Sequence, residues 1–213
     1  NPAGALEWYS FLWLWSAVLL ATALWLGGRR FLWVLAFPPV ALELYHGNIH
    51  LLLAAMIVLG FRHPACWVFG IFTKVTPGVG LVWFLVRREW RNLGIVLVLT
   101  AAIMAVSLLV DGQLWPEWIQ YAISAESGTQ VQQAQVPIPL LIRVPVAAVI
   151  VAWGARTDRR WAVPVGVTLA LPVLWPSGFA VLAACLATSS LAGAPLIRVG
   201  RHEGDRDPSS PIV

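Results

Sequence analysis

Long apolar runs, separated by short polar or charged stretches, make up most of this chain. A helix needs about 20 apolar residues to cross a hydrocarbon core of ~30 Å. The run from Trp8 to Leu26 has this length and is followed by Arg29 and Arg30. Similar runs predict spans at about 93–110, 138–154, 161–175 and 177–193. The pattern therefore predicts an all-α bundle of apolar helices.

The apolar region 31–61 is too long for one straight helix and carries two interruptions. Pro38-Pro39 lies in its first half, and the polar stretch ELYHGNIH, from Glu43 to His50, lies near its middle. Proline removes a backbone donor and ends or kinks a helix. We therefore expect two short crossings, at about 31–45 and 48–61, that meet at the polar stretch.

The region 65–86 has arginines at both ends and a lysine inside. Arg62 precedes it and Arg87 follows it, so a single crossing would place one of these charges on the wrong side of the membrane. Lys74 and Pro77 lie near its centre, where proline breaks a helix. The sequence predicts a re-entrant pair of half-helices with Lys74 at the turn, because irregular backbone at membrane depth must be buried in protein or line a cavity.

Composition places the chain among polytopic membrane proteins. Its hydrophobic fraction is 59%, its charged fraction is 11% and its mean hydropathy is +0.77, values that soluble domains do not reach. The net charge of +4 does not indicate nucleic-acid binding, because the arginines cluster in short turns, as in cytoplasmic loops. No Lys or Arg lies between Asn92 and Ile142, so residues 111–139 are predicted to form an outer loop, with an interfacial helix in QLWPEWIQYA.

The expected organisation is one transmembrane domain, residues 1–197, with about seven spans in addition to the re-entrant pair. Residues 198–213 are charged and contain Pro and Ser, which predicts a disordered cytoplasmic tail. This threading places residues 1–7 outside the membrane. We therefore expect one or more spans upstream of this chain.

Lys74 is the first candidate for chemistry, because an ionisable group inside a bilayer costs about 2.5–3.5 kcal/mol on insertion scales and is functional by default. Its ammonium, near backbone amides freed at a helix break, would suit a phosphate or pyrophosphate group. The alternatives are that Lys74 caps carbonyls at the break or snorkels to the interface.

Glu43, His46, Asn48 and His50 form the second candidate site. Their spacing would place the carboxylate and both imidazoles on one face of an unbroken helix, a set that suits zinc or manganese. The Gly-Asn pair between the histidines argues against an unbroken helix, and the order differs from the His-Glu-x-x-His pattern. Hydrogen bonding to a polar substrate and simple polarity at a hairpin end are the other interpretations. We expect no cofactor, with a divalent metal as the alternative.

Arg143 and the outer-loop tryptophans complete the candidates. Arg143 lies near the outer end of its predicted span and would either grip a lipid phosphate or snorkel to the headgroups. Trp115 and Trp118 would anchor the loop at the interface or stack on sugar rings.

The succession of these segments resembles glycosyltransferase family 87, polytopic enzymes of the C-type glycosyltransferase superfamily. The segments are FPPVALELYHGNIHLLLAA, FGIFTKVTPGVGLVWFLVRREWR, DGQLWPEWIQYA and LPVLWPSGFAVL, within residues 31–190. They are similar to the family's Gly-Gln-x-Asn segment, its Lys-x-x-Pro segment with an Arg-rich turn, its Trp-containing outer loop and its last motif. The corresponding positions are Gly47, Lys74, Pro77, Arg87, Arg88, Arg91, Trp118, Tyr121 and Trp175. Asn48 and His50 stand where the family has Gln and Asn, and Pro176-Ser177 replaces an Asp-His pair.

The resemblance implies transfer of a sugar, usually mannose or arabinose, from a polyprenyl-phosphate donor to an envelope glycolipid or glycan, as in actinobacteria. The reaction is expected on the extracytoplasmic face of the plasma membrane, without a nucleic-acid partner. The expected substrate-binding residues are Lys74, His46, Asn48, His50, Arg143, Trp118 and Trp175. The family's base is an aspartate of an outer loop that would lie upstream, so this fragment is expected to be inactive alone, with Glu43 as a substitute base.

Two other functions compete with the transferase. Broken helices and intramembrane charge also mark the translocation sites of transporters and lipid flippases. A structural membrane subunit would account for the spans but gives Lys74 no role.

Overall fold

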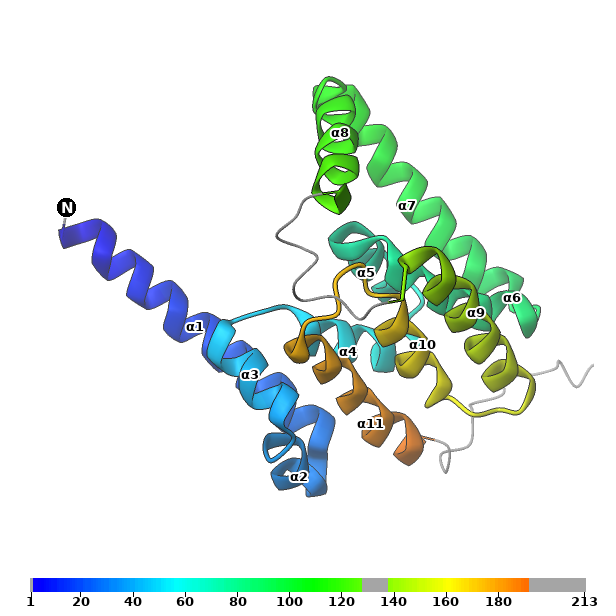
Figure 1. Ribbon diagram of the computed structural model, residues 1–213, viewed down its shortest axis with the longest axis horizontal. Coiled ribbons are helices and arrows are strands. Elements are labelled where there is room, and N and C mark those ends of the chain that lie inside the picture. The colour runs from blue at the N-terminus through cyan, green and yellow to red at the C-terminus, as the bar shows by residue number, and fades with distance from the viewer. Residues whose placement is uncertain (1, 128–137, 192–213) are drawn as a thin grey trace, which may run out of the picture.

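The computed structural model describes residues 2–127 and 138–191, with side chains described within 7–120 and 138–188. The elements are α1 (Pro2–Gly27), η1 (Gly28–Arg30), α2 (Phe31–Leu35), α3 (Pro38–His46), α4 (His50–Gly60), α5 (Cys66–Lys74), η2 (Thr76–Leu81), α6 (Val82–Val86), α7 (Trp90–Asp111), α8 (Leu114–Ser127), α9 (Leu140–Arg156), α10 (Ala162–Ala170), η4 (Pro176–Leu182) and α11 (Ala183–Leu191). All elements of the described residues are helical (Figure 1). The all-α prediction is confirmed. The predicted tail at 198–213 lies outside the described residues.

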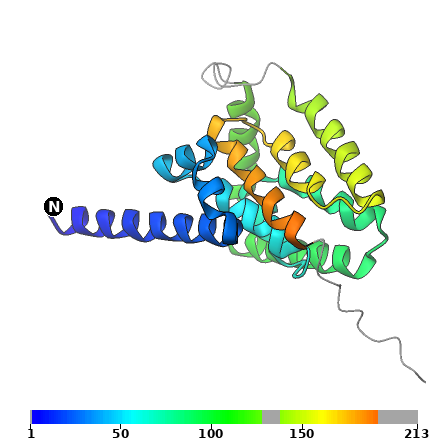
Figure 2. The same ribbon diagram turned by 90° about the horizontal axis from the view of Figure 1, so that it is seen from below.

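Two helices are long and apolar enough to cross a membrane. One runs from Glu7 to Leu35 through α1, η1 and α2, and the other is α7, from Trp90 to Asp111. Their side chains are mostly exposed, and α1 extends well beyond the rest of the protein (Figure 2). Exposed Leu, Val and Trp side chains on such helices suit contact with lipid.

A third candidate span is the bent pair formed by α3 and α4, whose axes differ by 115°. The described part of the chain therefore contains two candidate spans, or three with this pair. Other helices are short: α10 has nine residues and reaches only about 14 Å at 1.5 Å per residue. Short and broken helices are confirmed, whereas the count of seven spans stays a prediction.

The first break follows α2, where the chain reaches two prolines. Phe37 has an extended backbone, with ψ of 113°, and Pro38 begins α3 at its first position. Proline favours this arrangement because it disfavours the helical conformation in the residue before it and has no N–H to leave unpaired at a helix start.

Helix α4 is the centre of the fold. It is apolar all round, and eight of its eleven residues are buried, as expected for a helix with no solvent face. Leu53, Met56 and Ile57 pack into a cluster with α5, η2, α6, α9 and α10. Leu51 and Ala54 pack instead against α1, α3 and the η4–α11 segment. One helix thus joins two hydrophobic clusters, so its N-terminal end is held from both sides.

The segment from α5 to α6 leaves the end of α4 and returns beside it. Phe61, just after α4, packs edge-on against Trp83 of α6, with ring centroids 5.2 Å apart. Between them the helix breaks at Val75, directly after Lys74, and continues as η2. The segment therefore begins and ends at one side, and Lys74 lies at its turn. Its placement as a re-entrant pair in a membrane stays a prediction.

Glycine allows close packing within this segment. A Cβ on Gly80 would lie 2.1 Å from Cη2 of Trp67, and a Cβ on Gly60 would lie 2.4 Å from its Nε1. The indole is 1% exposed. The two glycines make the space that the buried indole occupies.

The basic turns after α6 and α9 contact each other. Arg87 donates to Oδ1 of Asp158 at 2.8 Å and to the carbonyl of Ala155 at 3.3 Å. The guanidinium of Arg160 lies 5.6 Å from the ring centroid of Phe61. The turns after α4, α6 and α9 therefore lie together on one side of the fold; that this side is cytoplasmic stays a prediction.

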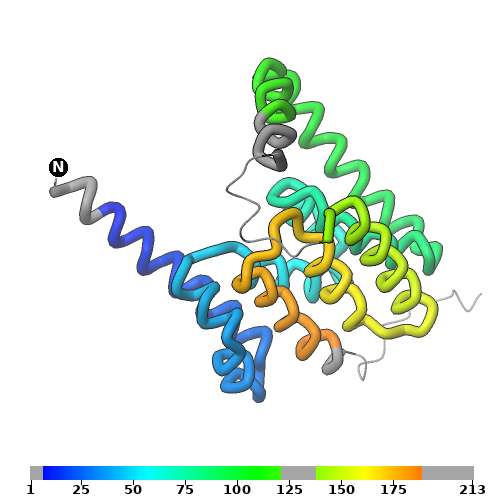
Figure 3. Tube along the Cα trace, viewed as in Figure 1, coloured from blue at the N-terminus to red at the C-terminus, as the bar shows by residue number. Residues whose placement is uncertain are grey.

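Helix α8 begins where a short helix was predicted. It folds back beside α7, as the tube in Figure 3 shows, and Trp115 Nε1 donates to Ser107 Oγ of α7 at 3.2 Å. Its position along a membrane interface remains a prediction.

Candidate functional site

The polar stretch between α3 and α4 forms a tight helix break. Gly47 has a φ of +64°, in the left-handed region, and its N–H donates to the carbonyl of Glu43 at 2.9 Å. This is a common way for a helix to end, and glycine adopts it without a steric cost. The indole N–H of Trp15 from α1 donates to the carbonyl of Gly47 at 2.6 Å. The break is therefore anchored to the first long helix.

Glu43 is fully buried and faces the start of α4. Its Oε1 accepts the backbone N–H of His50 and, at 3.3 Å, that of Leu51. These are two of the N–H groups that have no partner within a helix, and the positive end of the helix dipole favours a carboxylate there. Glu43 thus ends one helix and caps the next, which accounts for a charge in the core.

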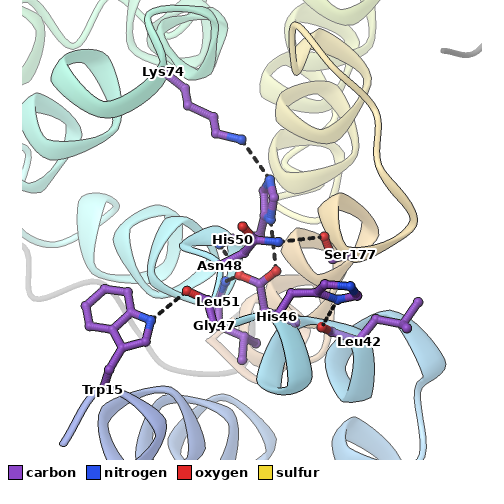
Figure 4. Close-up of polar contacts among 10 residues, drawn as sticks. Trp15, Leu42, His46, Gly47, Asn48, His50, Leu51, Lys74 and Ser177 are labelled. Atoms are coloured by element: carbon purple, nitrogen blue, oxygen red, sulfur yellow. Dashed lines mark hydrogen bonds and ion pairs between the residues drawn. The ribbon is translucent and has the colours of Figure 1, made fainter. Parts of the chain in front are cut away.

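His50 links this carboxylate to Lys74. Its Nδ1 lies 2.9 Å from Oε2 of Glu43, and its Nε2 lies 2.9 Å from Nζ of Lys74. His50 is 2% exposed, whereas Lys74 is half-buried. Figure 4 shows the lysine reaching from its own helix toward the imidazole. The chain of three groups therefore runs from a buried carboxylate to a partly open ammonium.

An ionised Glu43, a neutral His50 and a protonated Lys74 satisfy both contacts with one arrangement of protons. An ionised carboxylate only accepts hydrogen bonds, so in this arrangement Nδ1 of His50 carries the proton that it donates to Glu43. Nε2 of the neutral ring then has a lone pair, and the ammonium of Lys74 donates to it. The negative charge lies at the buried end of the chain and the positive charge at the open end. The site presents a positioned cation.

Asn48 lies beside this chain and connects it to η4. Its Nδ2 donates to Oγ of Ser177 at 3.2 Å (Figure 4), and Trp175, two residues before this serine, is 50% exposed. A Cβ on Gly178 would lie 3.8 Å from Nε2 of His50. The segment 175–178 therefore borders the imidazole.

Ser177 and Trp15 were not predicted to take part in this site. The Pro-Ser pair at 176–177 stands where the family has an Asp-His pair, so the motif predicts no contact for the serine. In the structure, the serine hydroxyl accepts a hydrogen bond from the amide of Asn48. For Trp15, the sequence offers no signal, because a tryptophan in an apolar helix more often meets lipid or the interface.

His46 is separated from the other polar groups by the break. It is exposed, and its Nδ1 lies 2.8 Å from the carbonyl of Leu42 on its own helix, pointing away from Lys74 (Figure 4). The one-face arrangement required an unbroken helix, and α3 ends at His46. Among the side chains that the structure describes, no three His, Cys, Asp or Glu groups gather as a metal site would require.

Arg143 lies elsewhere, on α9, with its guanidinium against the C-terminal end of α10. The residue is 4% exposed, and its guanidinium donates to the carbonyls of Ile138, Leu169, Leu171 and Pro172 at 2.8–3.1 Å. A cation at a helix C-terminus satisfies carbonyls that have no partner within the helix. This geometry favours a structural role for Arg143. It does not support the predicted contact with a lipid phosphate.

Trp118 lies on α8, with its ring 6.1 Å from that of Trp115. Its side chain is about half exposed. Figure 1 places α8 beside the far end of α7, away from the α3–α4 break. The structure thus brings Glu43, Asn48, His50 and Lys74 together and leaves Trp118, His46 and Arg143 outside the group.

Comparison with family models identifies the family of this chain. Residues 2–200 match the model of glycosyltransferase family 87, which covers nearly the whole chain. The curated proteins and the solved structures contain no match. Membership in this family implies a membrane glycosyltransferase, which needs a sugar donor and an acceptor. The chain belongs to glycosyltransferase family 87.

Proposed function

We propose that this membrane glycosyltransferase uses a polyprenyl-phosphate sugar as donor and that Lys74 binds the donor's phosphate. The sugar is mannose or arabinose, and the acceptor is an envelope glycolipid or glycan. The reaction takes place at the extracytoplasmic face. The observation that carries the proposal is the half-buried ammonium of Lys74, held at a helix break by a buried carboxylate–imidazole pair.

The chemistry of such a donor explains the need for this cation. When the glycosidic bond to the phosphate breaks, negative charge grows on the leaving phosphate oxygen, and a fixed positive group stabilises it in the transition state. In a site from which water is largely excluded, this interaction is much stronger than in bulk water. Lys74 supplies this charge.

Transfer also requires a base that takes the proton of the acceptor hydroxyl. Glu43 has both carboxylate oxygens occupied by His50 and the start of α4 and is 0% exposed. This geometry does not favour Glu43 as the base. We therefore place the base outside the group formed by Glu43, Asn48, His50 and Lys74.

The apolar surroundings suit a prenyl chain. Long helices with exposed Leu, Val and Trp side chains, α1 and α7, extend from the core on either side (Figure 1). A lipid tail would lie in the bilayer against such surfaces while its phosphate reaches the end of α5.

The test is transfer by membranes that contain the full-length protein. Radiolabelled mannose and arabinose, each on a synthetic polyprenyl phosphate, are supplied in turn, and label in lipid and glycan fractions is measured. We expect transfer from one of the two donors, and its loss in Lys74→Ala. Transfer only from a nucleotide sugar would contradict the proposed donor class, and undiminished transfer by Lys74→Ala would contradict the role of the lysine.

A further inference from the structure

We propose that His50 is a positioning residue for the donor phosphate: held in one tautomer by Glu43, it orients Lys74 toward the phosphate. The inference rests on the proposed function. It assigns His50 and Glu43 a shared task that goes beyond hydrogen bonding to a substrate.

The first argument is burial. His50 is 2% exposed and both of its ring nitrogens have partners, Glu43 on one side and Lys74 on the other. A ring so enclosed has no free nitrogen to offer to a substrate. Its effect on a ligand must therefore pass through Lys74, the half-buried member of the chain.

The second argument is the entropy of the lysine side chain. A lysine has four rotatable side-chain bonds, and fixing them in one conformation costs entropy. The hydrogen bond to Nε2 of His50 fixes the ammonium before a ligand arrives. A phosphate that meets a fixed cation does not pay this cost, so the imidazole increases affinity without touching the ligand.

The third argument is the direction of the hydrogen bonds. His50 accepts from Lys74 only while Nδ1 carries its proton, and the carboxylate of Glu43 enforces that tautomer. In Glu43→Gln the amide NH₂ can face Nδ1, which moves the ring proton to Nε2. Two donors then face each other, and Lys74 turns away. The amide oxygen still accepts from the backbone at the start of α4, so the helix cap survives.

Two substitutions at position 50 separate positioning from packing. His50→Leu fills a similar space and removes the acceptor for Lys74. His50→Gln keeps an amide N–H for Glu43 and an amide oxygen for Lys74. If His50 acts through Lys74, Gln retains more function than Leu, and Leu has no further effect once Lys74 is absent.

The experiment measures binding of farnesyl phosphate, with farnesol as the probe that lacks the phosphate. The purified full-length protein in detergent is titrated calorimetrically. We expect wild-type protein to prefer farnesyl phosphate to farnesol by tenfold or more. Lys74→Ala abolishes that preference, His50→Leu and Glu43→Gln each weaken it about three- to tenfold, and His50→Gln restores most of it.

A double-mutant cycle gives the decisive comparison. In the Lys74→Ala background, His50→Leu should change the dissociation constant by less than about twofold, since its effect passes through the missing ammonium. His63→Leu is the matched control, because His63 is an exposed histidine beyond the other end of α4. It should bind farnesyl phosphate as the wild type does.

Each outcome separates the two proposals. Equal binding of farnesyl phosphate and farnesol by the wild type would overturn the donor class, and the positioning role with it. If the phosphate preference depends on Lys74 but His50→Leu raises the dissociation constant of farnesyl phosphate by the same factor in both backgrounds, only the positioning role is overturned. If His50→Leu does not fold, as judged by its gel-filtration profile, the test uses His50→Gln and Glu43→Gln. An equal loss of the preference for farnesyl phosphate in both variants would contradict the proposal.

Discussion

Replacing Arg143 by glutamine should destabilise the fold without a direct effect on substrate. The substitution removes the guanidinium that donates to four carbonyls, among them Leu169 and Leu171 at the end of α10. Glutamine is shorter and has a single NH₂ group, so it cannot reach all of these oxygens. Carbonyls in this buried region then lack a partner.

The expected cost follows from the number of orphaned carbonyls. Each buried acceptor without a partner costs about 1–3 kcal/mol. Two such losses, at about 1.5 kcal/mol each, give about 3 kcal/mol. For a chain of 150–250 residues, each kcal/mol lowers the unfolding midpoint by about 2–4 °C, so we expect a decrease of about 6–12 °C.

The assay is the thermal unfolding of the detergent-purified protein, followed by tryptophan fluorescence. Arg156→Gln serves as the control, because Arg156 belongs to the same helix but is exposed at its other end. It should shift the midpoint by no more than about 2 °C, as surface substitutions usually do.

The opposite pattern would refute the structural role of Arg143. If Arg143→Gln unfolds within 2 °C of the wild type, the carbonyl contacts contribute little. If such a stable variant also loses its preference for farnesyl phosphate over farnesol, Arg143 grips a phosphate, as the sequence analysis expected.

Glycine substitutions test two close approaches in the same unfolding assay. Gly47→Ala should cost about 1–2 kcal/mol, because Ala is strained at a φ of +64° and its Cβ would lie 3.4 Å from Trp15. Gly94→Ala, a helical position with open space around it, should be neutral or slightly stabilising, and equal effects of the two changes would contradict the argument. Gly80→Ala should cost at least about 1–3 kcal/mol, since its Cβ would overlap Trp67 at 2.1 Å. Adding Trp67→Leu to Gly80→Ala should relieve part of that loss, whereas strictly additive losses would exclude the overlap as the cause.

Local chemistry allowed the sequence to predict the helix breaks. Pro38, Gly47 and Pro77 each act on their own backbone or on that of a neighbouring residue, so their effect is readable without the fold. The prediction that the polar stretch separates two short helices, and that Lys74 lies at a second break, used only these residues. Family 87 was identified in the same way, from the motifs around them.

The contacts that give the site its chemistry could not be read from the sequence. Lys74 and His50 are 24 residues apart, and Asn48 and Ser177 are 129 residues apart. Such contacts depend on how α4, α5 and η4 pack, and the burial of α4 decides that packing. Periodicity suggested that His46 and His50 would both share a face with Glu43, yet the break turns the following helix by 115° and brings His50, without His46, to the carboxylate.

Arg143 shows a second limit of the sequence. An arginine near the end of an apolar segment is typical of a residue that reaches the lipid headgroups. Its carbonyl partners at the end of α10 are 26–29 residues further along the chain. Only the packing of α9 on α10 reveals that the guanidinium is used within the protein.

A structure of the protein with farnesyl phosphate bound would test the central claim most directly. The account predicts a phosphate oxygen within hydrogen-bonding distance, about 2.7–3.2 Å, of Nζ of Lys74, with Nδ1 of His50 still on Glu43. A phosphate bound at the basic turns around Arg87, with the Lys74–His50 pair unoccupied, would contradict it.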